Sequence, residues 1–231
     1  MAHTLADRGF AVRAPLLAGH TDLHALERAT WRDWYDSAGT AFDELHDAGR
    51  RRVMVLGFSM GSLLALRLAA LRPDVVAGVI AIAVPLSLDA WKRRAISTLA
   101  KLRTSPLVGS LVGVLPKSGP DVRIQREFQN SPSLRGFPYP ALAELCALQD
   151  EVADLLPHVR APLLLVHGRL DHTTAPEQSS RVAQQVSSSR VELEILPRSF
   201  HIVGLDLDRD HACDRIARFA VSVLGDPNVA S

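Results

Sequence analysis

Compact runs of apolar residues alternate with helix-like patterns along most of the chain. Buried strands are predicted at five such runs: 10–14, 53–56, 79–84, 163–166 and 191–196. A helix is predicted at 63–71, after the second run, and Pro73 ends it. Strands that alternate with helices are typical of a mainly parallel sheet that helices cover on both faces. The pattern therefore predicts an α/β fold.

Helical spacing is clearest near the start of the chain. Apolar side chains recur there with the period of an amphipathic helix, at Trp31, Trp34, Tyr35, Ala38, Phe42 and Leu45. Gly49 is placed to terminate this helix. Residues 5–9 are expected to close an earlier helix at Gly9, directly before the strand at 10–14.

Prolines interrupt the middle of the chain, between residues 86 and 156. We expect this segment to form a small helical cap over the carboxyl edge of the sheet, within a single domain that spans 1–231. Apolar cap residues are candidates for an acyl pocket, although packing within the cap is the simpler explanation: Leu86, Leu88, Leu107, Val108, Leu111, Val112 and Leu115. The basic segment at 91–94 is better explained as a solvated helix face than as a contact with an interface.

The charge balance limits the partners that we expect. Lys and Arg number 26 against 25 Asp and Glu, so no strong overall field attracts nucleic acid or an anionic membrane. No run approaches the roughly 20 apolar residues of a membrane span, and the start lacks the features of a signal peptide. Cys146 and Cys213 are too few for a disulfide framework. We expect a cytoplasmic monomer or homodimer that acts on a small molecule, without stable membrane insertion.

The sequence Gly57-Phe58-Ser59-Met60-Gly61 follows one predicted strand and precedes a helix. This G-x-S-x-G pattern in a strand–turn–helix context is typical of a nucleophile elbow, although a glycine-rich turn gives the same letters. Small residues on either side of the serine allow the backbone to pass close by. We predict that Ser59 is the nucleophile and that the Met60 backbone N–H forms part of an oxyanion hole.

A serine hydroxyl needs a histidine base and an orienting carboxylate, which in this fold follow in the chain order Ser, Asp or Glu, His. Asp171 lies on the loop after the strand at 163–166, and His201 lies on the loop after the strand at 191–196. We predict that these two residues complete the site. The rival histidines are His167 and His172, and the rival acids are Asp206, Asp208 and Asp210, for which helix capping is the simpler explanation.

Two clusters of potential metal ligands do not fit a metal site. His20, Asp22 and His24 alternate along the chain, but no second motif shares a site with them. Residues 206–217 resemble a calcium loop, yet His211 replaces its glycine and Ala217 its final glutamate. We predict no metal and no cofactor.

Beyond the elbow, the chain resembles the carboxylesterase and monoacylglycerol lipase group of α/β-hydrolases, which are similar to serine aminopeptidases of the S33 kind. The resemblance rests on three further segments, 15–20, 30–34 and 200–203, and runs from about Leu5 to Phe219. It implies a triad of Ser59, Asp171 and His201, the helical cap, and hydrolysis of esters with short to medium acyl chains or of monoacylglycerols. Peptidase or C–C bond hydrolysis on the same triad, or a binding protein without turnover, are alternatives.

The chain departs from the pattern of this group at two places. Thr21 replaces the last glycine of the G-H-G loop. The group also carries an upstream strand and an H-G-F loop that supplies the second oxyanion donor, and we find neither. We therefore expect a chain that is truncated at its N-terminus, with a strand missing between 10–14 and 53–56. Loss of one oxyanion donor costs about 100- to 1,000-fold in turnover.

Overall fold

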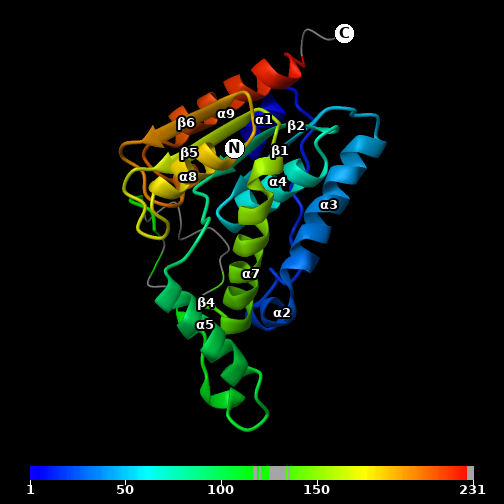
Figure 1. The fold of residues 1–231 in the computed structure, drawn as a ribbon. Coiled ribbons are helices and arrows are strands. Elements are labelled where there is room, and N and C mark those ends of the chain that lie inside the picture. Colours follow the sequence, from blue (N-terminus) through cyan, green and yellow to red (C-terminus); the bar gives the residue numbers. More distant parts are fainter. Residues whose placement is uncertain (117–118, 120, 125–133, 135, 228–231) are drawn as a thin grey trace.

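The computed structural model describes residues 1–116, 119, 121–124, 134 and 136–227 (Figure 1). Its centre is a four-stranded parallel sheet in the order β1-β2-β5-β6. The strands are β1 (Val53–Phe58), β2 (Val76–Ile82), β5 (Leu163–Gly168) and β6 (Val191–Leu196). The predicted α/β fold and four of the five predicted strands are therefore confirmed.

Helices cover both faces of the sheet. On one face, α3 (Trp31–Asp47), α4 (Met60–Leu71) and α8 (Glu177–Gln185) pack in the larger core. On the other face, α9 (Arg209–Leu224) and the short α1 (Ala2–Asp7) cover a second core. Alternate residues of β2 and β5 enter the two cores, because successive side chains of a strand point to opposite faces. The two-sided burial explains why these strands are apolar throughout.

The helix predicted from the stripe at 31–45 is present as α3. Thr30 caps its N-terminus by accepting from the Asp33 N–H, and the Asp33 carboxylate accepts from the Thr30 N–H in return. Trp31, Trp34 and Phe42 bury the apolar face of the helix. Gly49 follows its C-terminus with φ +85°, a left-handed conformation that favours glycine.

The described part of the predicted cap contains α5 (Ala90–Arg103), η1 (Gly109–Leu111) and the first turns of α7 (Tyr139–Leu155). Ile96 of α5 packs against Leu142 and Cys146 of α7. The short α2 (Leu23–Arg28) also lies beside α7, and a two-residue antiparallel pair joins β3 (Leu115–Pro116) to β4 (Gly136–Phe137). Figure 1 shows α5 and the loop after it at the end of the molecule far from the sheet.

Part of the segment predicted as a cap, 86–156, packs in the main core of the fold. Leu86, Leu148 and Val152 are buried in the larger core, so the later turns of α7 belong to the main fold. Residues 117, 118, 120, 125–133 and 135 of the predicted cap lie outside the described residues. After α7 the chain continues through η2 (Leu156–His158), and η3 (Val203–Leu205) precedes α9. Among the described residues, no helix is long and apolar enough to cross a membrane.

The strand predicted at 10–14 was wrong, because this segment pairs with no neighbouring strand that the structure describes. A strand needs a neighbour for its backbone hydrogen bonds, and no such bond joins 10–14 to another described strand. A cavity of about 830 Å³ is lined by Phe10, Val12 and Ala14 on one side and by Val53 and Val55 of β1 on another. The expected additional strand between these segments stays a prediction.

Candidate active site

The turn between β1 and α4 holds Ser59 in a strained conformation. Ser59 has φ +50° and ψ −123°, and α4 begins at the next residue. A non-glycine residue with positive φ persists only where its surroundings enforce that conformation. Here the Ser59 N–H donates to the Ile82 carbonyl of β2 at 2.8 Å, which ties the turn to the neighbouring strand.

The two glycines of the elbow have different roles. A Cβ atom on Gly57 would lie 2.0 Å from the Gly61 carbonyl oxygen, so only glycine allows the helix to start this close to the strand. A Cβ atom on Gly61 would meet no atom within 4 Å. The prediction of close backbone passage is therefore confirmed for Gly57 and wrong for Gly61.

The structure brings together the three side chains that the sequence predicts. Nε2 of His201 lies 3.0 Å from Oγ of Ser59, and Nδ1 of His201 lies 2.7 Å from Oδ2 of Asp171. Asp171 follows β5 and His201 follows β6, so all three emerge from the carboxyl edge of the sheet. The three groups form one continuous chain of hydrogen bonds from the hydroxyl to the carboxylate.

Asp171 is held by donors on both carboxylate oxygens. Its Oδ1 accepts from the N–H groups of Thr173 and Thr174, each at 2.8 Å. Its Oδ2 faces His201 and also Nε2 of His167, at 3.1 Å. The side chain is fully buried. Burial alone would raise the pKa of Asp171, but the hydrogen bonds from His167 and His201 outweigh it and hold the pKa well below its usual range.

His167 contacts Asp171, which the sequence did not predict. Its Nε2 faces two acceptors, Asp171 Oδ2 and the Thr174 carbonyl at 3.0 Å, so this nitrogen carries the proton. Nδ1 then accepts from the Ser179 hydroxyl at 2.7 Å. The ring is fully buried and contacts the acid, whereas His201 contacts Ser59.

His172, the other rival histidine, also lies away from the hydroxyl of Ser59. Its ring is mostly exposed and pairs with Asp121 at 2.8 Å. The Asp121 carboxylate also accepts from the Thr173 N–H and hydroxyl, and its carbonyl accepts from the Ile202 N–H. Asp121 therefore connects the loop that carries Asp171 to the loop that carries His201.

The loop that carries His201 is fixed by Asp206 and Asp208. Asp208 accepts from the Arg198 N–H at 2.8 Å and from the Ser199 hydroxyl at 2.9 Å, and Asp206 accepts from the Phe200 N–H at 2.8 Å. Both carboxylates are buried. Helix capping was the wrong explanation for Asp208, because it sits at the N-cap of α9 without a side-chain cap bond. Sequence spacing does not reveal such contacts, since they depend on how the loop folds back.

Met60 is the first residue of α4. The first N–H groups of a helix have no acceptor within the helix and carry its partial positive charge. The Ser59 N–H donates to the Ile82 carbonyl and is therefore not available to an oxyanion. The Met60 N–H stays the predicted donor.

The residues weighed as metal ligands have other contacts. Asp22 caps α2 by accepting from the Ala25 N–H, and the His20 ring packs edge-on against Trp34. Among the described residues, no group of three or more His, Cys, Asp or Glu side chains is arranged to hold a metal ion.

A parallel sheet with a serine elbow, an acid after a later strand and a histidine after the last strand defines the α/β-hydrolase class. The family model described as "Serine aminopeptidase, S33" matches residues 1–208, and the chain belongs to this family. The family resemblance seen in the sequence is therefore confirmed.

Named relatives share most of the chain. A thermostable monoacylglycerol lipase of Bacillus sp. (strain H-257) is 26% identical over 220 residues, which is 95% of this chain and 82% of the relative. A carboxylesterase of Bacillus subtilis (strain 168) is 23% identical over 210 residues, 89% of this chain and 79% of the relative.

Solved structures agree on the fold. A structure described with the metagenome-derived lipolytic enzymes LipS and LipT has a TM-score of 0.81 at 26% identity, and covers 96% of this chain and 86% of that chain. The monoacylglycerol lipase of Paleococcus ferrophilus has a TM-score of 0.74 at 18% identity, with 95% and 86% covered.

Proposed function

We propose that this hydrolase cleaves carboxylic esters with short to medium acyl chains, or monoacylglycerols, through an acyl-enzyme on Ser59. The observation that carries the proposal is the chain of hydrogen bonds from Ser59 through His201 to Asp171, at 3.0 and 2.7 Å. The family and the two named relatives, a monoacylglycerol lipase and a carboxylesterase, support ester hydrolysis.

In the first half of the proposed reaction, Ser59 Oγ attacks the ester carbonyl while Nε2 of His201 takes its proton. Asp171 accepts from Nδ1–H of His201, which keeps Nε2 free to act as base and then stabilises the imidazolium. His201 returns the proton to the leaving alkoxide, and the alcohol departs. The acyl group is then bonded to Ser59.

In the second half, water attacks the acyl-enzyme carbonyl and gives a proton to His201. The tetrahedral intermediate collapses, the Ser59 oxygen recovers the proton, and the carboxylic acid leaves. Negative charge develops on the carbonyl oxygen in both halves, and the Met60 N–H is the donor that we assign to it. Asp171 stays ionised throughout, consistent with the lowered pKa of its carboxyl group.

An apolar surface beside the reacting atoms favours an acyl chain. Phe58 precedes the nucleophile, is partly exposed, and its ring lies 5.1 Å from the His201 ring between centroids. Leu107 and Leu111, which the sequence offered for an acyl pocket, are 89% and 82% exposed, so they line no enclosed pocket. The candidate surface for the acyl chain therefore lies at Phe58 and not at Leu107 and Leu111.

Hydrolysis rates on a substrate series test the proposal. We expect turnover of p-nitrophenyl esters and of a 1-monoacylglycerol, and none of it in Ser59→Ala. A peptide p-nitroanilide serves as the amide comparison, because a peptidase on the same three residues would cleave it with a higher kcat/KM than the unactivated 1-monoacylglycerol. That outcome, or ester turnover that survives Ser59→Ala, would contradict the proposal.

A further inference from the structure

Three residues in the middle of the chain lie against the loops that carry Asp171 and His201. They are residues 121–123, and we call them the strap. The strap falls within 86–156, the part of the chain predicted as a cap, whereas the two loops follow strands of the sheet. Its central residue is buried, and the side chain of Asp121 is 16% exposed. The strap is therefore packed against the main fold, where it can influence both loops.

The Asp121 carboxylate binds the loop after β5 through both of its oxygens. Oδ2 accepts from the N–H groups of His172 and Thr173, at 2.9 and 3.1 Å, and from the Thr173 hydroxyl at 3.0 Å. Oδ1 pairs with Nδ1 of His172 at 2.8 Å. The Thr173 N–H also donates to Oδ1 of Asp171 at 2.8 Å, so one N–H group joins the two carboxylates. Asp121 therefore holds the two residues that directly follow Asp171.

The backbone of the strap holds the loop after β6. The Asp121 carbonyl accepts from the Ile202 N–H at 3.0 Å. The Arg123 N–H donates to Oδ2 of Asp206 at 3.2 Å, and the same oxygen accepts from the Phe200 N–H at 2.8 Å. Phe200 and Ile202 are the chain neighbours of the histidine in this loop. The strap therefore reaches both sides of that histidine.

The two loops also meet each other directly, but at earlier residues. The Leu170 N–H donates to the Ser199 carbonyl at 3.1 Å, which joins the loops before Asp171 and before His201. Loop backbone opens locally at little cost where few bonds hold it. The strap adds bonds at the later positions of both loops, next to the two side chains whose separation matters.

We propose that Asp121 is a positioning residue for the proposed ester hydrolysis. It holds the loop of Asp171 against the loop of His201 and so maintains the 2.7 Å separation between His201 Nδ1 and Asp171 Oδ2. The inference rests on the proposed function, because it concerns how the groups of that reaction are placed. A displacement of about 1 Å in such a set of groups can cost about a hundredfold in rate.

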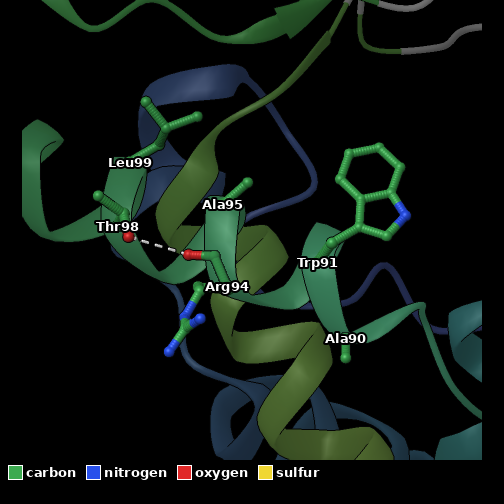
Figure 2. A pocket seen from close by; sticks show the side chains of 6 residues that line it. All are labelled: Ala90, Trp91, Arg94, Ala95, Thr98 and Leu99. Carbon is green, nitrogen blue, oxygen red and sulfur yellow. Dashed lines mark hydrogen bonds between the residues drawn. The ribbon is translucent and has the colours of Figure 1, made fainter.

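Another part of the predicted cap supplies a matched control. Figure 2 shows α5, where Trp91 and Arg94 lie beside a shallow hollow of the surface. Ion pairs join α5 to α7 and to α2, and the pair with α2 is formed by Arg103 and Glu27. The Glu27 side chain is 20% exposed, close to the 16% of Asp121, so both are mostly buried acids with a partner in another part of the fold. Glu27→Ala therefore removes a comparable contact that involves neither loop.

Steady-state kinetics on a water-soluble p-nitrophenyl ester test the inference. We expect Asp121→Ala to lower kcat by about ten- to a hundredfold with little change in KM, because it displaces reacting groups and leaves the surface at Phe58 intact. Asp121→Asn keeps an acceptor oxygen for the N–H groups of His172 and Thr173 and should recover most of kcat. His172→Ala removes only the ring contact and should stay close to the parent value. Glu27→Ala should lower the melting temperature as Asp121→Ala does but keep the parent kcat.

The proton between His201 and Asp171 gives a second readout that needs no turnover. A short hydrogen bond to a carboxylate moves its proton to low field in the proton NMR spectrum. We expect this low-field resonance in the parent protein and in Glu27→Ala, and its broadening or loss in Asp121→Ala. Asp121→Ser is a milder second variant with the same expected result, in case Asp121→Ala does not fold.

Two outcomes would overturn the inference. One is a parent kcat together with an unchanged low-field resonance in folded Asp121→Ala or Asp121→Ser. The other is an equal loss of kcat in Asp121→Asn and Asp121→Ala. A parent protein without esterase activity would instead contradict the proposed function, and the resonance would then still decide whether Asp121 positions His201 and Asp171.

Discussion

At Asp171, four donors converge on one carboxylate. Two backbone N–H groups and two histidine rings share the oxygens of Asp171, and only one of the histidines reaches Ser59. We therefore expect His167 to act as a positioning residue, because its bond to Oδ2 holds the carboxylate that also binds His201. The sequence analysis weighed His167 as an alternative to His201 for the base. Its contact with Asp171 could not be predicted, because it forms only when the loop after β5 folds back.

Removal of the His167 donor should slow the acylation step without weakening substrate binding. We expect His167→Ala to lower kcat by about ten- to a hundredfold with little change in KM, because a hydrogen bond to a charged group contributes about 1.5–3 kcal/mol. His167→Gln retains an N–H donor on a side chain of similar reach and should recover much of kcat. Steady-state kinetics on a soluble ester measure both values. An equal loss in the two variants would contradict the positioning role.

Ser59, Asp171 and His201 were predictable because a nucleophile elbow and the loops after two later strands meet at the same edge of a parallel sheet. The motif predicts a glycine on each side of Ser59, but it does not tell which of the two glycines the packing requires. The sequence gives them the same letter, but the Cβ contacts distinguish them.

The glycines give a matched pair of substitutions. Gly57→Ala places a methyl group 2.0 Å from the Gly61 carbonyl oxygen, so it should lower the melting temperature sharply or prevent folding. Gly61→Ala meets no atom within 4 Å and lies in helix α4, where alanine is favoured by up to about 1 kcal/mol. Thermal unfolding of both variants measures the difference. A Gly61→Ala variant less stable than Gly57→Ala would refute the assignment.

At the scale of elements, two aspartates near the end of the loop between β6 and α9 hold the first part of that loop in place. Asp206 and Asp208 bind backbone N–H groups on either side of Ser199, two residues before His201. The sequence placed these acids near a helix start, where capping is common, but the loop uses them to orient His201. Gly168 completes the arrangement, because a Cβ there would lie 2.3 Å from the Phe200 carbonyl oxygen.

The contacts in this loop predict that Asp208→Ala and Asp210→Ala differ in their effects on stability and on kcat. Asp208→Ala leaves the buried Ser199 hydroxyl and the Arg198 N–H without their acceptor, so it should cost about 1–3 kcal/mol of unfolding free energy and also lower kcat. Asp210→Ala removes a side chain that is 92% exposed and should change neither quantity. Urea unfolding and ester kinetics on both variants test this, and equal effects would contradict it.

At the scale of the whole molecule, the two-sided parallel sheet followed directly from the apolar runs. The run at 10–14 failed, because an apolar segment becomes a strand only where a neighbour completes its hydrogen bonds. The cap at 86–156 stays a prediction. Residues of α7 pack both in the larger core and against α5, and these two sets of apolar residues look alike in sequence.

Stability should depend on pH through Asp171. The pKa of Asp171 in the fold is lowered: burial opposes ionisation, but the bonds from His167 and His201 outweigh it. Its contribution is therefore fully present above the unfolded pKa of about 3.9 and is lost as pH falls toward the folded pKa. The difference in unfolding free energy between the parent protein and Asp171→Asn should be largest near neutral pH and should shrink below about pH 4. Urea titrations across this range measure it, with Asp210→Asn as the exposed control, and a difference that grows toward acid pH would contradict it.

The central claim is that Ser59 is a nucleophile activated by His201 and Asp171. The most direct measurement is the intact mass of the protein after reaction with a fluorophosphonate, which phosphonylates an activated serine. We predict the addition of a single label, its absence in Ser59→Ala, and much slower labelling in His201→Ala, because the hydroxyl then has no base. Labelling of Ser59→Ala at the parent rate would contradict the claim.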